Sequence, residues 1–153
     1  MAERRFRVPP VVVFLATGAL MMLAARAVPS AGLSIPGDRI AAGMFTAAGA
    51  AVALAGVIGL QRASTTVNPL RPETAGRLVV RGVYRISRNP VYLGMLLLTV
   101  AWSVRLANAL AWAGVAVFFV VMDRYQIPHE ERALRAAFGA SFREYAARVR
   151  RWL

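Results

Sequence analysis

The sequence predicts an all-α, integral-membrane bundle of about four transmembrane helices, followed by a cytoplasmic C-terminal amphipathic helical segment. Three observations support this prediction: a high apolar content, four apolar stretches of spanning or nearly spanning length, and an uneven distribution of arginine. Hydrophobic residues make up 58% of the 153 residues and charged residues only 17%, below the roughly 25% of soluble proteins. The length allows one domain, so we expect residues 1–153 to form a single membrane domain.

The predicted spans cover about residues 11–28, 40–60, 91–104 and 109–122. A helix needs about 20 mostly apolar residues to cross the hydrocarbon core, and the first two stretches meet or approach that length. The last two belong to one apolar run that Arg105 and Asn108 interrupt. A single span would place Arg105 near the bilayer centre at a cost of several kcal/mol. We therefore predict a hairpin that turns at residues 105–108.

The first stretch has an alternative interpretation. A basic start, an apolar core and the sequence Ala25-Arg26-Ala27 also resemble a secretory signal with a small-residue cleavage site. Both interpretations leave residue 28 on the outer side of the membrane, so the predicted topology of the later spans is the same.

The basic residues indicate the orientation. All nineteen are arginine, against seven acidic residues, and the formal net charge is +12. Cytoplasmic segments of membrane proteins carry an excess of positive charge. With the N-terminus inside, sixteen arginines are cytoplasmic and three are outside, namely Arg26, Arg39 and Arg105. This asymmetry predicts a multi-pass protein with both termini in the cytoplasm. Because the arginines follow the membrane boundary, we expect contact with membrane lipids and no nucleic-acid partner.

The second apolar stretch carries a small residue at every fourth position: Gly43, Ala47, Ala51, Ala55 and Gly59. Such a row lets two membrane helices approach closely, although the alanine-rich composition alone also produces it.

The composition gives little support for a metal site. The chain has no cysteine and one histidine, which excludes thiolate zinc sites and argues against a multi-histidine centre. We expect no metal.

The polar segments are a cytoplasmic loop at residues 61–90 and a cytoplasmic tail at residues 123–153. In the loop, Leu78-Val79-Val80 fits either a short strand or a turn of interfacial helix. Pro90 suits the first turn of the third span, with Asn89 at or near its cap. A helix N-terminus beside the Arg88 guanidinium is a ready anion site. The alternative is an ordinary helix start with a lipid-facing arginine.

In the tail, Pro128 is expected to begin a new helix. Glu130 and Glu131 fall in its first turn, where the helix dipole favours carboxylates; alternatively, the two carboxylates bind a cation at the membrane surface. Further on, apolar residues recur every three or four positions. This spacing predicts an amphipathic helix, or two helices broken at Gly139, lying on the cytoplasmic leaflet. The apolar positions are Phe138, Phe142, Tyr145, Val149 and Trp152.

Taken in order, TTVNP, GVYRISRNPVYLG, an apolar hairpin and EERALRAAFGASFREYAARVRRWL resemble the isoprenylcysteine carboxyl methyltransferase-like proteins of bacteria, which belong with the phospholipid methyltransferases. The resemblance covers roughly residues 64–153 and rests on the order and spacing of three motifs. It implies an S-adenosylmethionine-dependent methyltransferase in the bacterial inner (cytoplasmic) membrane. It also implies a cofactor pocket that opens to the cytoplasm and is closed by the C-terminal segment, with a lipophilic substrate entering from the bilayer.

The family motifs can be placed residue by residue. The R-H/N-P-x-Y-x-G motif corresponds to Arg88, Asn89, Pro90, Tyr92 and Gly94. The preceding G-x-Y corresponds to Gly82 and Tyr84, and the E-E pair to Glu130 and Glu131. The resemblance implies that all these residues bind the cofactor and that Arg88, Asn89 and Tyr92 are catalytic. Eukaryotic members typically carry histidine where this chain has Asn89, and asparagine does not titrate near neutrality. That difference argues against a catalytic base at this position.

The charged groups of S-adenosylmethionine match these residue types. Glu130 or Glu131 can pair with its ammonium, and Arg88 or backbone N–H groups near Pro90 can bind its carboxylate. A ring of Tyr84 or Tyr92 can approach the sulfonium, a contact worth of order 1 kcal/mol. Gly94 would let the adenine or the substrate come close to the helix backbone.

The methyl acceptor stays open: an isoprenylcysteine-like carboxylate, a lipid amine, or a small thiol or acid. Two alternative functions are an NADPH-dependent membrane reductase of the sterol or steroid type and a non-catalytic membrane adaptor. Against the reductase, Met95 follows Gly94 where such enzymes tend to carry an acidic residue.

Overall fold

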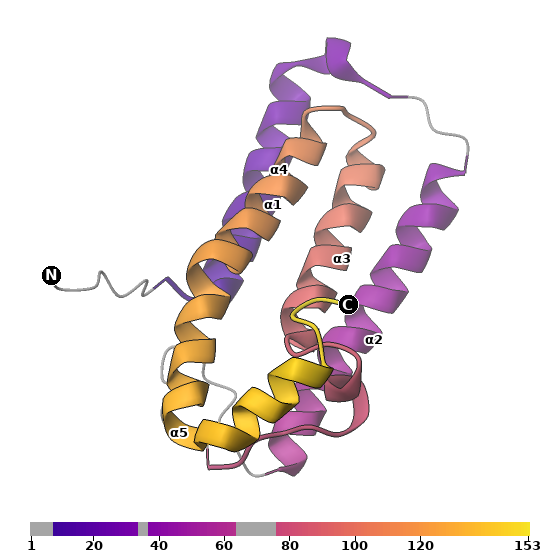
Figure 1. Cartoon of the computed structure of the whole chain (residues 1–153). Helices are drawn as coiled ribbons and strands as arrows, with labels where there is room; N and C mark the ends of the chain where they lie inside the picture. The colour runs from indigo at the N-terminus through magenta and orange to yellow at the C-terminus, as the bar shows by residue number, and fades with distance from the viewer. Residues whose placement is uncertain (1–7, 34–36, 64–75) are drawn as a thin grey trace, which may run out of the picture.

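The computed structural model describes residues 8–33, 37–63 and 76–153, which form an α-helical bundle (Figure 1). The α-helices are α1 (Pro10–Ala27), α2 (Asp38–Arg62), α3 (Pro90–Leu106), α4 (Ala111–Val121) and α5 (Ile127–Arg148). The described part contains no strand, only an isolated bridge between Gly32 and Asn108, so the all-α prediction is confirmed. The arginines before residue 8 and the TTVNP segment lie outside the described residues.

The helix bounds follow the apolar stretches closely. α1 and α2 are long and apolar enough to cross a membrane, and α3 is apolar but shorter, with 17 residues. α3 ends at Leu106, and Ala107 adopts a left-handed conformation with φ 47°. The buried Asn108 side chain donates to the Val28 carbonyl (3.0 Å). The predicted hairpin is therefore present, but Arg105 belongs to the last turn of α3 and the chain reverses only after Leu106.

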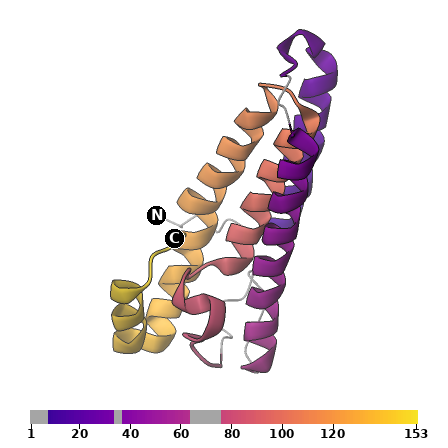
Figure 2. The same cartoon turned by 90° about the vertical axis from the view of Figure 1, so that its right-hand side faces the viewer.

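The chain stays helical from α4 into α5, through the π-helical segment η4 (Met122–Gln126). Figures 1 and 2 show α4 and the first half of α5 as one long helix. As predicted, Pro128 lies in the first turn of a new α-helix, which begins at Ile127, although the chain before it is already helical. Hydrogen bonds in η4 run five residues back, as from the Ile127 N–H to the Met122 carbonyl. This wider turn relieves the clash that a proline makes with the carbonyl four residues before it.

The predicted break at Gly139 is confirmed. Its backbone is non-helical, with φ 51° and ψ −116°, and a positive φ is readily adopted only by glycine. The helix then turns back toward the base of α3, as the yellow segment of Figure 1 shows. Phe142 and Tyr145 are buried, at 1% and 4% exposure. The prediction that the apolar side chains of this segment face the leaflet is therefore wrong for these two, because they pack inside the protein.

α2 and α3 pack through glycines. A Cβ on Gly94 would lie 2.5 Å from the Gly49 carbonyl oxygen, and a Cβ on Gly56 would lie 2.9 Å from the Val91 side chain. The contact face of α2 therefore runs along Gly49, Ala53 and Gly56. The predicted row of small residues is mostly not this face, because four of its members are exposed: Gly43, Ala47, Ala51 and Ala55. Gly94 serves helix packing and lies against α2.

We expect Gly94→Ala to lower the free energy of unfolding by about 1–3 kcal/mol, the usual cost of overpacking. The added methyl group meets backbone atoms of α2, so the two helices must separate. Gly43→Ala is the matched control on α2, because an added Cβ meets nothing within 4 Å. The higher helix propensity of alanine should then leave the stability unchanged or raise it. Thermal unfolding in detergent compares the two, and equal midpoints would refute the packing role of Gly94.

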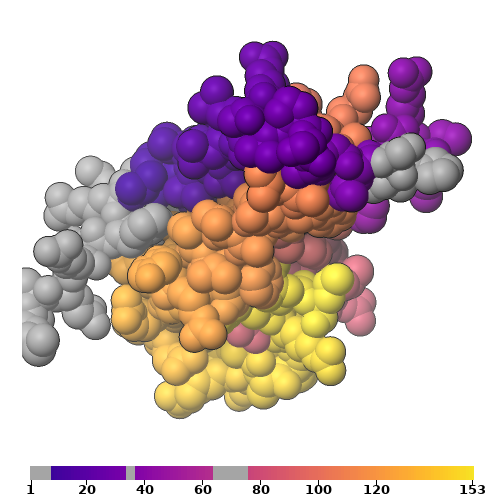
Figure 3. Space-filling view, turned by 90° about the horizontal axis from the view of Figure 1, so that it is seen from above, coloured from indigo at the N-terminus to yellow at the C-terminus, as the bar shows by residue number. Residues whose placement is uncertain are grey.

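α1 packs on α4. Figure 3 shows α1 on one side of α4 and the C-terminal segment on the opposite side. The Phe14 and Phe118 rings meet edge to face at 6.1 Å, and Met21 is buried against Gly114. The Trp102 indole N–H donates to the Gly18 carbonyl (3.1 Å), which also fastens α1 to α3.

Candidate active site

The residues before α3 hold the backbone of the chain's last residues. The Ser87 hydroxyl and the Asn89 amide both donate to the Arg151 carbonyl (3.2 and 3.1 Å). The Arg88 backbone N–H donates to the Arg150 carbonyl (3.0 Å). Asn89 immediately precedes α3, as expected, but its side chain forms no cap hydrogen bond. The motif at the base of α3 therefore contacts residues more than 60 positions away.

The Arg88 side chain points into the protein and is 13% exposed, so the lipid-facing alternative is wrong. Its Nε and Nη2 donate to Oε1 of Glu131 (3.2 and 2.7 Å). Its Nη1 donates to the carbonyl oxygens of Ala146 (3.1 Å) and Val149. All three guanidinium nitrogens are thus engaged by protein groups.

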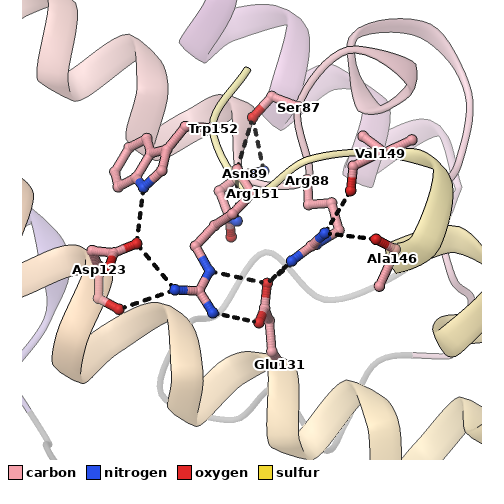
Figure 4. Close-up of polar contacts among 9 residues, drawn as sticks. All are labelled: Ser87, Arg88, Asn89, Asp123, Glu131, Ala146, Val149, Arg151 and Trp152. Carbon is pink, nitrogen blue, oxygen red and sulfur yellow. Dashed lines mark hydrogen bonds and ion pairs between the residues drawn. The ribbon is translucent and has the colours of Figure 1, made fainter.

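Glu131 joins Arg88 to a second arginine. Arg151 Nη2 donates to Oε2 of Glu131 (2.9 Å), and its Nη1 donates to Oδ1 of Asp123 (3.0 Å). The Trp152 indole N–H donates to the same oxygen (3.0 Å). Figure 4 shows this alternation of cations and carboxylates. We call Arg88, Glu131, Arg151, Asp123 and Trp152 the tail clamp.

The carboxylates of the tail clamp are ionised at neutral pH. Burial alone would raise the pKa of Glu131, but hydrogen bonds from Arg151 and Arg88 outweigh it and lower that pKa below its ordinary value. Burial likewise opposes ionisation of Asp123, and hydrogen bonds from Trp152 and Arg151 lower its pKa overall. Two carboxylates therefore balance the two arginines of the clamp.

Glu130 lies in a different environment from its neighbour Glu131. It accepts hydrogen bonds from the Tyr92 hydroxyl and from Nε2 of Gln126 (2.6 Å), and no cation among the described residues contacts it. Burial, helped by the charge of Glu131 and opposed by these hydrogen bonds, raises the pKa of Glu130 to about 7. Beside it, the buried Oε1 of Gln126 has no partner within the described residues. A carboxylate and an amide oxygen are thus available to a donor.

Two tyrosines fix the short 3₁₀ helix η3 (Gly82–Arg85). The Tyr84 hydroxyl donates to the Gly56 carbonyl (3.3 Å), and the Tyr145 hydroxyl donates to the Tyr84 carbonyl (2.7 Å). Burial raises the pKa of Tyr145 to about 12 and that of Tyr84 above its ordinary value, so both phenols stay neutral. Just before η3, Leu78-Val79-Val80 adopts neither strand nor helix.

Some of these groups line a cavity of about 70 Å³, whereas Asp123, Gln126, Arg151 and Trp152 do not. Its lining contains five residues of the predicted site, namely Tyr84, Arg88, Asn89, Glu130 and Glu131, together with Leu60, Arg77, Leu78, Val79, Leu134, Phe142 and Tyr145. The predicted residues Gly82, Pro90, Tyr92 and Gly94 are not part of this lining. Gly82 is exposed, with φ 61°, and Pro90 packs near Gly56. Tyr92 contributes indirectly, through its bond to Glu130.

The resemblance implies S-adenosylmethionine as the cofactor. The polar groups of this cavity match its chemistry, but the cavity is too small to contain it. The Glu130 carboxylate in the cavity wall is an acceptor for an ammonium, whereas Gln126 lies outside the lining. Pockets for ligands of this size usually measure about 300–1,000 Å³, so binding requires the cavity to widen.

Sequence reasoning missed Gln126, Asp123 and Arg151. In the part of the chain that the structure describes, no cluster of three potential metal ligands occurs.

The chain is similar to known methyltransferases. The model of the phospholipid methyltransferase family matches residues 38–141. Protein-S-isoprenylcysteine O-methyltransferase B of Arabidopsis thaliana is 37% identical over 93 residues, which is 61% of this chain and 47% of that protein. A probable protein-S-isoprenylcysteine O-methyltransferase of Oryza sativa subsp. indica is 36% identical over 96 residues, 61% of this chain and 49% of that protein.

A further relative is an uncharacterized protein of Haemophilus influenzae, 46% identical over 63 residues, which is 41% of this chain and 100% of that protein. The chain spans about half the length of the plant methyltransferases that it matches. No solved structure matches it.

Proposed function

Because the chain belongs to the phospholipid methyltransferase family, we propose that it transfers a methyl group from S-adenosylmethionine to a lipophilic acceptor at the cytoplasmic face of a membrane. The observation that carries this proposal is the partly buried Glu130 carboxylate in the cavity wall, which accepts hydrogen bonds from neutral groups only among the described residues. When bound, the cofactor supplies an activated methyl group on a sulfonium. Its ammonium, with three N–H donors, pairs with the Glu130 carboxylate.

In this proposal the motif residues have different roles. Glu130 binds the cofactor ammonium, and Tyr92 positions the Glu130 carboxylate through its hydroxyl. Asn89 and Tyr84 contact the cofactor from the cavity wall. Arg88 is a positioning residue, because protein acceptors already engage its guanidinium, and Glu131 holds the tail clamp. Gly82, Pro90 and Gly94 shape the backbone around the site.

The site suits a displacement reaction that needs alignment and the exclusion of water. Ser87, Arg88 and Asn89 hold the backbone of residues 149–151 at the base of α3, and Arg88 and Asn89 also line the cavity. Asn89 cannot act as a base near neutrality, and no base is needed for a carboxylate or thiolate acceptor. An isoprenylcysteine-like carboxylate, a lipid amine and a small thiol or acid are the acceptor classes to test.

We further propose that α1, α2, α3 and α4 cross the bacterial inner membrane with both termini in the cytoplasm, in one membrane domain. The arginine asymmetry and the two long apolar helices support this topology. The packing of Phe14 and Met21 of α1 against α4 favours a retained span over a cleaved signal. The η1 helix (Pro29–Ala31) and the α3–α4 turn then lie at the outer face, and the candidate site lies at the inner face.

We expect S-adenosylhomocysteine, which keeps the ammonium, to bind more tightly as the pH rises from about 6 to 8. Glu130 has a pKa of about 7 in the free protein, and only its carboxylate form pairs with the ammonium. Well below that pKa, affinity should fall roughly tenfold per unit of pH, because binding must release one proton. Calorimetry in buffers of different ionisation enthalpy measures both quantities. Affinity independent of pH would contradict the role of Glu130.

The direct test of the function is transfer of radiolabelled methyl groups from S-adenosylmethionine into lipid and protein fractions of membranes that contain the full chain. Label should appear in a lipid-soluble acceptor and be lost in Glu130→Gln. Binding assays distinguish the alternatives: S-adenosylhomocysteine binding is expected, whereas NADPH binding indicates a reductase. Binding of neither would overturn the proposal and leave a membrane adaptor.

A further inference from the structure

α2 and α3 diverge toward the end of the bundle that carries the α3–α4 turn, as Figure 1 shows. Near the candidate site the two helices touch: a Cβ on Gly56 or Gly49 would lie within 3 Å of α3. Farther along α2, a Cβ on Gly43 would meet nothing within 4 Å. Gly43 therefore borders open space beside the α2–α3 contact.

This open space is a groove of about 510 Å³. Its floor is formed by Ala42 and Ala101, which are buried at 6% and 4% exposure. Leu98 and Trp102 line the α3 side, and Arg39 and Arg105 lie at the end near the turn. The Trp102 ring is fixed by its hydrogen bond to Gly18 of α1. Gly43 and Thr46 complete the lining, and we call these eight residues the outer groove.

The outer groove combines an apolar floor with two cations. Among the described residues, neither the Arg39 nor the Arg105 guanidinium has an ion-pair partner. The nearest acid in sequence, Asp38, accepts the backbone N–H of Arg39 (2.7 Å) and balances at most one of the two charges. The groove thus offers an excess of positive charge beside the partly exposed apolar side chains of Leu98 and Trp102, which is complementary to an anionic amphiphile.

We propose that the outer groove binds an anionic phospholipid of the outer leaflet. The phosphate lies between the guanidiniums of Arg39 and Arg105, which suit phosphate geometry, and one acyl chain covers the partly exposed side chains of Leu98 and Trp102. A free phosphate would leave these two side chains uncovered. The proposal rests on the membrane orientation proposed above, in which both arginines lie at headgroup depth, and not on methyl transfer.

The test is native mass spectrometry of the purified full chain in detergent, titrated with phosphatidylglycerol or phosphatidylcholine. We expect preferential binding of phosphatidylglycerol, weakened about tenfold or more in the double variant Arg39→Gln/Arg105→Gln, because two charge-assisted hydrogen-bond sites are lost. Gly43→Leu should also weaken lipid binding by filling the groove, where the added side chain finds open space. Arg26→Gln, at the same end but outside the groove, is the matched control and should bind like the parent.

Equal binding of the two lipids, or a double variant that binds like the parent, would overturn the proposal. So would inorganic phosphate competing as well as the lipid, or a dimer that Gly43→Leu abolishes, because the occupant would then be an ion or a second copy of the chain. Titration with S-adenosylhomocysteine separates this proposal from the proposed function. Lipid preference without cofactor binding defeats only the methyltransferase proposal, and cofactor binding without lipid preference defeats only the groove proposal.

Discussion

Glu131→Gln is expected to lower the free energy of unfolding by about 3 kcal/mol and to release the last residues of the chain from the base of α3. Glu131 lies between two guanidiniums, 2.7 Å from Arg88 and 2.9 Å from Arg151. Glutamine keeps the shape of the side chain but leaves two neighbouring cations without their shared anion. Breaking a buried ion pair from one side costs about 3–5 kcal/mol, and the 31% exposure of the Arg151 side chain places the expected cost at the lower end.

Two measurements check this result. Chemical denaturation in detergent gives the stability, and limited trypsin digestion followed by intact-mass analysis reports cleavage after Arg148, Arg150 and Arg151. Glu144→Gln is the matched control on the same helix, because Glu144 is exposed and lies outside the tail clamp. If Glu131→Gln and Glu144→Gln are equally stable and equally protected from trypsin, the clamp does not hold the tail.

Glu130→Gln, at the adjacent position, should weaken cofactor binding strongly and change stability little. We expect it to weaken S-adenosylhomocysteine binding at least about thirtyfold, because removing one partner of a buried charge pair costs about 2–5 kcal/mol. Its effect on the free protein should be neutral or stabilising at pH 8. The pKa of Glu130 is raised by burial to about 7, so its contribution to stability is complete at low pH and is lost as the pH rises through 7. Because glutamine cannot ionise, the Glu130→Gln variant does not lose stability as the pH rises through 7.

Calorimetric titration at pH 8 measures the affinity, and thermal unfolding of the same samples measures the stability. Glu131→Gln is the informative comparison, since it carries the same change at the adjacent position. Loss of binding together with loss of folding in Glu130→Gln would show that this carboxylate is structural. Parent-like binding by a folded Glu130→Gln protein would remove it from the cofactor site.

The sequence predicted the helices well because their signals are local. The ends of each span predicted from apolar length and flanking arginines lie within about two residues of the ends of a helix. Arg105 correctly marked the hairpin. Gly139 was recognisable because the backbone there requires a positive φ that other residues rarely adopt. Each of these features depends on a few neighbouring residues.

The partners of the site residues could not be predicted, because they come from distant parts of the chain. A carboxylate in a first helical turn satisfies the helix dipole, a cofactor or an arginine equally well, and only the fold brings Arg151 to Glu131. Gly94 had the same ambiguity: a glycine in a motif permits close approach without revealing whether a ligand or a helix approaches. Pro128 marked the first turn of α5 correctly, but the π-helical turn that joins α5 to α4 has no sequence rule of comparable strength.

That π-helical turn sets the angle at which α5 presents its side chains. An α-helix advances about 100° per residue, and a π-helical turn behaves as the insertion of one residue into it. Removing one residue from Met122–Gln126 would let the helix continue in α-helical form while rotating every later side chain by about 100° relative to α4. Glu130 would turn away from Tyr92 and Glu131 from Arg88, although each helix and every charge would remain. Substitutions can change single contacts of this site, whereas a change of length in this one turn would separate all the α5 side chains of the site from their partners at the base of α3.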